Sequence, residues 1–286
     1  MKIIKVIALA FLMLASQPGT ADSGPTLEQI KQTGTVRIGY RESEPPMSFI
    51  DKDKNPAGYS IDLCVRIVNE VKQTLGNKDI SIKYVPVTAA NRFQAIAEDK
   101  IDILCGSTTK TISRAELVDF TQHTFVTGAS LLSLRKVPIE GVSGLQGKKV
   151  AVVKDTTTFD HLATALKDAV IDAQVIAVNS ASEGMKALKS GEVHAFASDQ
   201  VVLIGLALTN EGNEEFSIAE DVFSFEPFAM AVKRNDSEFR LLADRALSRL
   251  YRSGQITPIY KKWFGQFTKE VPSMLQAMYL LNSTPE

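Results

Sequence analysis

Several features of enzymes and of nucleic-acid-binding proteins are missing from this sequence. The formal net charge is only −1 over 286 residues, so no basic surface for nucleic acid is indicated. The three histidines, His123, His161 and His194, show no metal-ligand spacing. The chain has no G-x-S-x-G elbow, no P-loop and no G-x-G-x-x-G fingerprint. These absences favour a protein that is not an enzyme and that needs no metal or cofactor.

Apolar runs long enough to cross a membrane are also missing. The longest N-terminal run, Val6 to Ala15, has about ten residues and is too short to span a bilayer. Lys2 and Lys5 precede it, and the small-x-small sequence 19–21 follows, so residues 1–21 are predicted to be a cleavable signal peptide. The alternative is a buried N-terminal helix. The residue directly after the cleavage site is not a cysteine, so we expect a soluble periplasmic protein without a lipid anchor.

Cysteine is scarce, and its two copies are informative in an exported protein. Cys64 and Cys105 form an even pair in an oxidising compartment. A bridge between them would close a loop of about forty residues and stabilise the fold by a few kcal/mol. We expect this disulfide; the alternative is two buried free thiols.

The stretch from Ile101 onward contains the clearest candidate for a binding site. A buried strand ends at Gly106 and is followed by the hydroxyls of Ser107 and Thr109 and then by Arg114. Open α/β sheets hold ligands at the carboxyl edge of their strands, and a guanidinium matches a carboxylate with two parallel hydrogen bonds. The alternative is an ordinary turn with a surface arginine.

A second series of strands and helices repeats this pattern. The strand 150–153 enters a turn that ends in Thr157 at a predicted helix N-terminus, which is a favourable place for an anion. Another strand ends at Asp199. If the two polar strand ends face each other, a cleft lies between them, with guanidinium on one side and carboxylate on the other.

Two apolar extended segments, 124–134 and 225–233, connect the two series and are predicted to be crossovers. We therefore predict lobe 1 over residues 22–126 and 229–286, and lobe 2, including the hinge crossovers, over residues 127–228. The fold class is α/β, with two open mixed sheets flanked by helices and joined by a two-strand hinge.

In this order, the motifs resemble those of the bacterial periplasmic solute-binding proteins of the polar amino acid ABC uptake family (family 3). The resemblance covers the mature chain, implies the type II two-lobed fold, and is closest for the glutamate/aspartate-binding branch. Its markers are the motifs Gly58-Tyr59-x-Ile61-Asp62-Leu63, Cys105-Gly106-Ser107-Thr108-Thr109, Asp119-Phe120-Thr121, Thr156-Thr157 and Tyr260-x-x-Trp263-Phe264, together with Arg41-Glu42-Ser43, Asn91-Arg92, Arg114 and Asp199.

The resemblance implies a role for each candidate residue at the α-carbon of the ligand. Arg114 would bind the α-carboxylate with the help of Thr109 and Thr157. Asp199, with Ser107 and Thr109, would bind the α-ammonium.

Arg41 and Arg92 would pair with a side-chain carboxylate, so the implied ligand is L-glutamate or L-aspartate. Three residues depart from the branch: Ala89 replaces a serine, Ala181 a histidine and Lys154 a threonine. A larger ligand, another polar amino acid or another dicarboxylate therefore stays open.

The implied function is that of the substrate-binding component of an amino acid importer. Its expected partners are the amino acid and the membrane permease of an ABC transporter, and a monomer is expected. The alternatives are a dehydratase-like periplasmic enzyme on the same fold and a sensor that docks on a receptor.

Overall fold

The computed structural model describes residues 24–209, 215–268 and 270–285. The predicted signal peptide, residues 1–21, lies outside this part of the chain. The helices are α1 (Pro25–Thr33), α2 (Tyr59–Thr74), α3 (Arg92–Ala97), α4 (Ile112–Ala115), the 3-10 helix η1 (Val142–Leu145), α5 (Thr157–Asp168), α6 (Ala181–Lys189), α7 (Gln200–Thr209), α8 (Ser237–Arg252), α9 (Ile256–Phe264) and α10 (Ser273–Leu281). None of the helices described combines the length and the apolar character needed to cross a bilayer.

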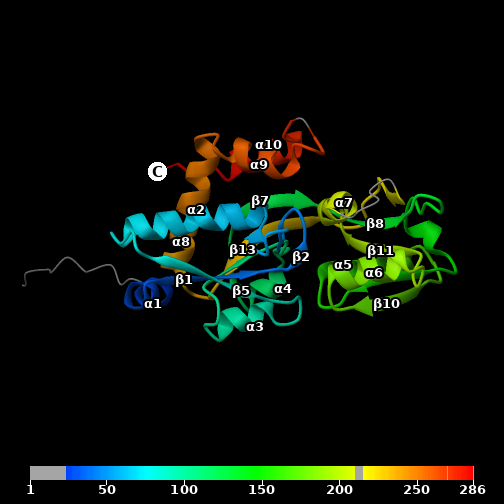
Figure 1. Cartoon of the computed structure of the whole chain (residues 1–286), viewed down its shortest axis with the longest axis horizontal. Helices are drawn as coiled ribbons and strands as arrows, with labels where there is room; N and C mark the ends of the chain where they lie inside the picture. Colours follow the sequence, from blue (N-terminus) through cyan, green and yellow to red (C-terminus); the bar gives the residue numbers. More distant parts are fainter. Residues whose placement is uncertain (1–23, 210–214, 269, 286) are drawn as a thin grey trace, which may run out of the picture.

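Two mixed five-stranded sheets form the framework, one in each half of the molecule (Figure 1). The first has the order β5-β1-β6-β13-β7; its strands are β5 (Ser81–Pro86), β1 (Thr35–Tyr40), β6 (Ile103–Cys105), β13 (Glu226–Val232) and β7 (Asp119–Thr127). The second has the order β10-β9-β11-β8-β12; its strands are β10 (Gln174–Val178), β9 (Lys149–Val153), β11 (Ala195–Asp199), β8 (Ala129–Leu134) and β12 (Phe216–Ile218). A small sheet, β2 (Ser43–Glu44), β3 (Ser48–Ile50) and β4 (Pro56–Ala57), extends from the first half. The predicted α/β class with two open mixed sheets is confirmed.

Three parallel strands in each sheet place their carboxyl ends at one edge. In the first sheet β5, β1 and β6 run parallel, and β13 is antiparallel to both β6 and β7. In the second sheet β10, β9 and β11 run parallel, and β8 is antiparallel to β11 and β12. Parallel strands need crossover helices, which cover the faces and leave the strand ends free for ligands.

The two predicted crossovers lie side by side. Strand β7 ends at Thr127 and β8 begins at Ala129, so the chain passes from one sheet to the other at Gly128. The return strand β13 pairs with β7 at Glu226↔Thr127. A side chain at Gly128 would meet the Ser224 carbonyl oxygen at 2.5 Å, so only glycine lets the two connections pass this closely.

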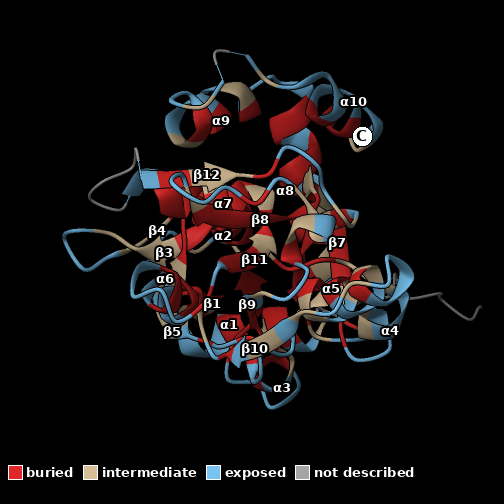
Figure 2. Ribbon diagram, turned by 90° about the vertical axis from the view of Figure 1, so that its right-hand side faces the viewer, coloured by how far each residue is buried: buried red, intermediate tan, exposed pale blue. Residues whose placement is uncertain are grey.

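The core of the first half is fastened by the predicted disulfide and by aromatic packing. Cys64 of α2 is bonded to Cys105 at the end of β6, which confirms that prediction. Near the C-terminus, Phe264 of α9 stacks on Phe125 of β7 with ring centroids 5.1 Å apart, and its ring also meets Tyr59 of α2. Buried residues fill the interior of both halves (Figure 2).

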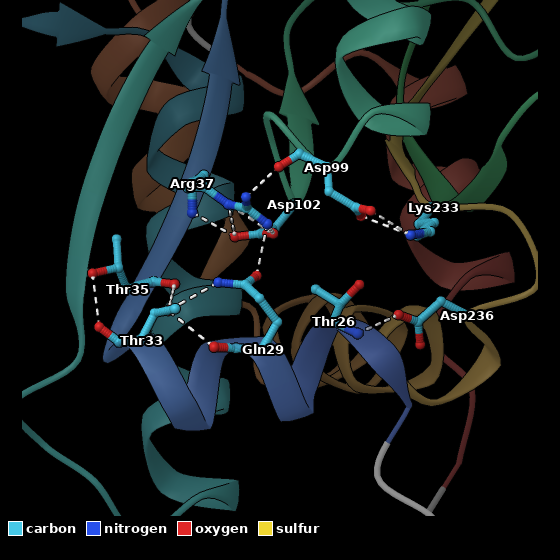
Figure 3. A network of polar contacts seen from close by, with 9 residues as sticks. All are labelled: Thr26, Gln29, Thr33, Thr35, Arg37, Asp99, Asp102, Lys233 and Asp236. Atoms are coloured by element: carbon cyan, nitrogen blue, oxygen red, sulfur yellow. Dashed lines mark hydrogen bonds and ion pairs between the residues drawn. The ribbon is translucent and has the colours of Figure 1, made fainter.

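A polar network closes the edge of the first sheet where β1 begins (Figure 3). Arg37 of β1 donates to both carboxylate oxygens of Asp102 and to Gln29 Oε1 of α1. Asp99 binds Lys233, just beyond β13, at 2.7 Å. These bonds join α1, β1, β6 and β13. They fix the relative positions of the strands, and therefore also the positions of the strand ends at the opposite edge of the sheet.

Candidate functional site

Four strand ends meet at one cavity between the two sheets. Strand β1 leads directly to Arg41, β6 to Ser107, β9 to the turn before α5, and β11 ends at Asp199. The cavity is lined by Arg41, Glu44, Arg92, Ser107, Thr109, Arg114, Val153, Thr156, Thr157, Thr158, Ala181, Ala197, Ser198 and Asp199. All seven ligand-binding residues predicted from the sequence are in this set; that they bind a ligand stays a prediction.

The cavity is nearly closed. Its volume of about 20 Å³ is roughly that of one water site. Contacts across it include Arg92 Nη2 to the Asp155 carbonyl oxygen at 3.1 Å and Thr157 Oγ1 to Thr109 Oγ1 at 3.3 Å. Both contacts join elements that belong to different sheets.

Arg114 is held at the cavity wall by the short helix α4. Thr111 caps this helix by accepting a hydrogen bond from the Arg114 amide at 3.1 Å. The guanidinium donates through Nη1 to the Thr109 carbonyl oxygen at 2.9 Å. Burial lowers the pKa of Arg114, while Glu226 and Asp199 act in the opposite direction. The group stays charged at neutral pH and can bind a carboxylate with its remaining donors.

Arg92 occupies the first helical position of α3, where a cation opposes the helix dipole. The structure shows what holds it there: its guanidinium lies 4.5 Å from the centre of the Phe93 ring and donates to the Ala89 and Asp155 carbonyl oxygens. Burial, followed by repulsion from Arg114 and Arg41, lowers the pKa of Arg92 to about 9. Its positive charge is costly without an anion nearby.

Asp199 faces the arginines across the cavity with an unused oxygen. Among the described residues, its Oδ1 is the one buried side-chain nitrogen or oxygen with no hydrogen-bond partner. Burial is the largest cause that raises the pKa of Asp199 well above its usual value, and Glu226 and Glu44 add to it. A buried carboxyl oxygen without a hydrogen-bond partner is costly, so a cationic donor is the group that best fits here.

Glu226, which the sequence analysis did not identify, connects both sides of the site. Its side chain is fully buried at the start of β13. Oε2 accepts from Thr109 at 2.5 Å and from Thr157 at 2.7 Å, and Oε1 accepts from Ser224 at 2.6 Å and lies 3.0 Å from Nδ1 of His161. In the sequence, Glu226 could have been noticed as the single carboxylate inside the apolar segment 225–233.

Glu44 is a second carboxylate that the sequence analysis missed. Its Oε1 lies 2.9 Å from Arg41 Nη2, and its Oε2 accepts from Ser107 Oγ at 2.6 Å. Ser107 and Arg41 are therefore both bound by this carboxylate in the closed cavity.

The three departures from the branch pattern lie in different surroundings. Ala181 lines the cavity, and the Ala89 carbonyl oxygen accepts from Arg92. Lys154 is exposed and is not part of the lining, so this substitution lies outside the cavity. The reason is that the turn after β9 directs its hydroxyls, and not Lys154, toward the cavity.

In the described part of the chain, no cluster of three or more His, Cys, Asp or Glu residues could hold a metal ion.

Comparison with known proteins gives a consistent result. Residues 36–266 match the family described as bacterial extracellular solute-binding proteins, family 3. The L-glutamate/L-aspartate-binding protein of Pseudomonas aeruginosa is 32% identical over 88% of this chain and 84% of its own length. The glutamate/aspartate import solute-binding protein of Salmonella typhimurium is 29% identical over 91% of this chain and 86% of its own length. An ancestral arginine-binding protein bound to arginine matches in structure, with a TM-score of 0.72 and 29% identity over 81% of this chain and 98% of its own.

Proposed function

The chain belongs to family 3 of the bacterial extracellular solute-binding proteins, and from this membership we propose that it is the periplasmic substrate-binding component of an ABC amino acid importer. Its ligand would be an acidic amino acid, L-glutamate or L-aspartate. Relatives at 29–32% identity over most of the chain bear the names of glutamate- and aspartate-binding proteins. The proposed site is the cavity between the two sheets.

The observation that carries the proposal is the unpartnered Asp199 Oδ1 in a cavity that also contains the Arg114 guanidinium. An α-amino acid brings an ammonium and a carboxylate on one carbon atom. The ammonium would satisfy Asp199, and the carboxylate would satisfy the free donors of Arg114. An uncharged ligand would leave at least one of these buried charges unpaired.

The neighbouring hydroxyls fit defined roles. Thr109 and Thr157 donate their hydroxyl protons to Glu226, so their oxygens can accept from the α-ammonium. The first N–H groups of α5, at Thr157 and Thr158, have no partner within the helix and would donate to the α-carboxylate. In the proposed arrangement Arg41 and Arg92 face the side chain of the ligand, and Ser107 lies on the Asp199 side.

Closure of two lobes around the ligand is the proposed mechanism. Lobe 1 would comprise residues 22–126 and 229–286, and lobe 2 residues 127–228. Each lobe supplies groups that the other lacks: guanidinium from lobe 1, and the α5 N-terminus and Asp199 from lobe 2. Since the ligand binds both sets only in the closed state, its differential affinity would shift the population toward closure.

The remaining features of the proposal follow from the family. The protein would reach the periplasm through the signal peptide of residues 1–21, act as a monomer and deliver its ligand to a membrane permease. We propose no enzymatic activity and no cofactor, since the family and the relatives compared above are solute-binding proteins.

A thermal-shift screen with the common amino acids, followed by calorimetry, tests the proposal. L-Glutamate or L-aspartate should give the largest rise in melting temperature, because selective binding stabilises the native state. The Arg114→Ala variant should lose roughly 100-fold in affinity, because a buried carboxylate then lacks its partner. Arg66→Ala, at an exposed position on α2, is the control and should bind like the wild type. A basic or apolar amino acid giving the largest shift would overturn the ligand assignment, and unchanged affinity in Arg114→Ala would overturn the site.

A further inference from the structure

Glu44 occupies the cavity in a way that the proposed ligand does not explain. Two acidic groups already face the ligand's ammonium, Asp199 directly and Glu226 through the threonines. Glu44 instead binds Arg41, a residue assigned to the side-chain carboxylate of the ligand. Both of its oxygens are in use, and its side chain is only 10% exposed.

The local fold fixes Glu44 in this position. It belongs to the two-residue strand β2 and pairs with Ser48 of β3. Ser48 in turn accepts from the Arg41 amide at 2.9 Å and donates to the Arg41 carbonyl oxygen at 3.2 Å. Gly106 provides the space, since a Cβ there would lie 3.2 Å from Arg41 Cγ. Arg41 and Glu44 are thus held together by the backbone and do not meet by chance.

The pairing changes what the side-chain end of the pocket can bind. Of the two arginines on that side, only Arg92 lacks a carboxylate partner among the described residues; it donates to backbone carbonyl oxygens. Arg92 and Glu44 line the same small cavity, so a ligand carboxylate placed against Arg92 also meets the charge of Glu44. Like charges repel in a buried site. A carboxamide offers an oxygen to the guanidinium and an NH₂ group to the carboxylate, and so satisfies both.

We propose that Glu44 is a specificity-determining residue that reduces the preference of the site for a side-chain carboxylate over a side-chain carboxamide, so that L-glutamine is a ligand beside L-glutamate. This inference rests on the proposed function, because it assumes an α-amino acid in the same cavity. It concerns only the distal group of that ligand.

Calorimetric titration of L-glutamate and L-glutamine into the wild type and Glu44→Gln tests the inference. In the wild type, the two dissociation constants should agree within about tenfold. In Glu44→Gln, glutamate should gain about tenfold relative to glutamine, because the repelling charge is removed while the shape is kept. Glu42→Gln is the matched control: it removes the same charge at an exposed neighbouring position and should leave the ratio unchanged.

The outcomes separate the two proposals. If the wild type binds glutamate but the ratio is the same in Glu44→Gln, the role of Glu44 is wrong while the proposed function stands. A wild type that prefers glutamate over glutamine by more than about 100-fold would also overturn the proposed role of Glu44. If the wild type binds none of L-glutamate, L-glutamine and L-aspartate, the proposed function is wrong and the role of Glu44 falls with it. If Glu44→Gln does not fold, Glu44→Ser also removes the charge and can replace it. The ratio of the glutamate and glutamine dissociation constants in the wild type tests the inference without any variant.

Discussion

Two buried carboxylates of the site, Glu226 and Asp199, differ in how their charge is satisfied. Glu226 accepts hydrogen bonds from three hydroxyls and contacts His161, so both of its carboxylate oxygens have partners. Asp199 keeps one oxygen unpaired and depends on the more distant charges of Arg114 and Arg41. These contacts fit a structural role for Glu226, whereas the unpaired oxygen of Asp199 fits a role in binding a ligand.

The raised pKa of Asp199 leads to a prediction about pH. In the ligand-free closed state the carboxyl group holds its proton more tightly than in the unfolded chain, so its contribution to stability is present at low pH and is lost as the pH rises through the raised value. A ligand ammonium favours the ionised form, so binding strengthens over the same rise. The ligand-induced increase in melting temperature should therefore be larger near pH 7.5 than near pH 5.

The Asp199→Asn variant is the control for this pH effect. It removes the titrating group, so the increase in melting temperature should be small and nearly equal at the two pH values. A pH dependence as large as that of the wild type would mean that a group other than Asp199 causes the effect.

At the scale of elements, helix α7 is one of the parts of the second half that contact the first. Its residues between Gln200 and Thr209 are apolar, and most of them are buried against β8, β11 and β12 or against the loop after β2. A Cβ built on Gly205 would lie 2.1 Å from the Pro45 carbonyl oxygen. Glycine at this position permits the closed approach of the two halves.

Replacing Gly205 by alanine should separate stability from closure. Alanine favours a helix over glycine by about 1 kcal/mol, so the ligand-free protein should be as stable as the wild type or more stable. The added methyl group should oppose closure and weaken ligand binding by about tenfold or more, which calorimetry measures. Gly141→Ala is the control, since its Cβ would meet open space and its backbone is extended. Wild-type affinity in Gly205→Ala would show that this contact does not limit closure.

The disulfide joins α2 to β6 and acts on stability alone. Its cysteines are 41 residues apart, so loss of the bridge should lower the free energy of unfolding by about 2–4 kcal/mol. Urea denaturation of the Cys64→Ser/Cys105→Ser variant measures this loss. Neither cysteine lines the cavity, so ligand affinity should be unchanged. A loss well below 1 kcal/mol would mean that packing alone holds α2 on the sheet.

For the molecule as a whole, the proposed hinge closure implies a second, open state. The cavity of about 20 Å³ fits a closed state, and β7 and β13 with their continuations are the proposed hinge. Saturating L-glutamate should therefore reduce the radius of gyration measured by small-angle X-ray scattering. Arg114→Ala at the same ligand concentration should show no reduction. Equal radii with and without ligand in the wild type would argue against hinge closure.

Much of this architecture could be predicted from the sequence. Periodicity located the strands, and the glycine and hydroxyl residues after them marked where each strand ends. Because parallel strands end at a common edge, the motifs around Ser107, Arg114 and Asp199 were expected to share a cleft before any coordinates were known. The charge types alone, guanidinium against carboxylate, indicated a zwitterionic ligand.

The tertiary structure alone decided which other charges reach the cavity. Glu44 lies three residues after Arg41 in the short strand β2, and Glu226 lies in a segment that the sequence marked only as a crossover. Their contacts with Ser107 and with Thr109 and Thr157 join residues that are 63 to 117 positions apart in the sequence. Local patterns encode where a strand ends, because backbone conformation depends on near neighbours. Which side chains then meet depends on how the two halves close, and no local pattern specifies that.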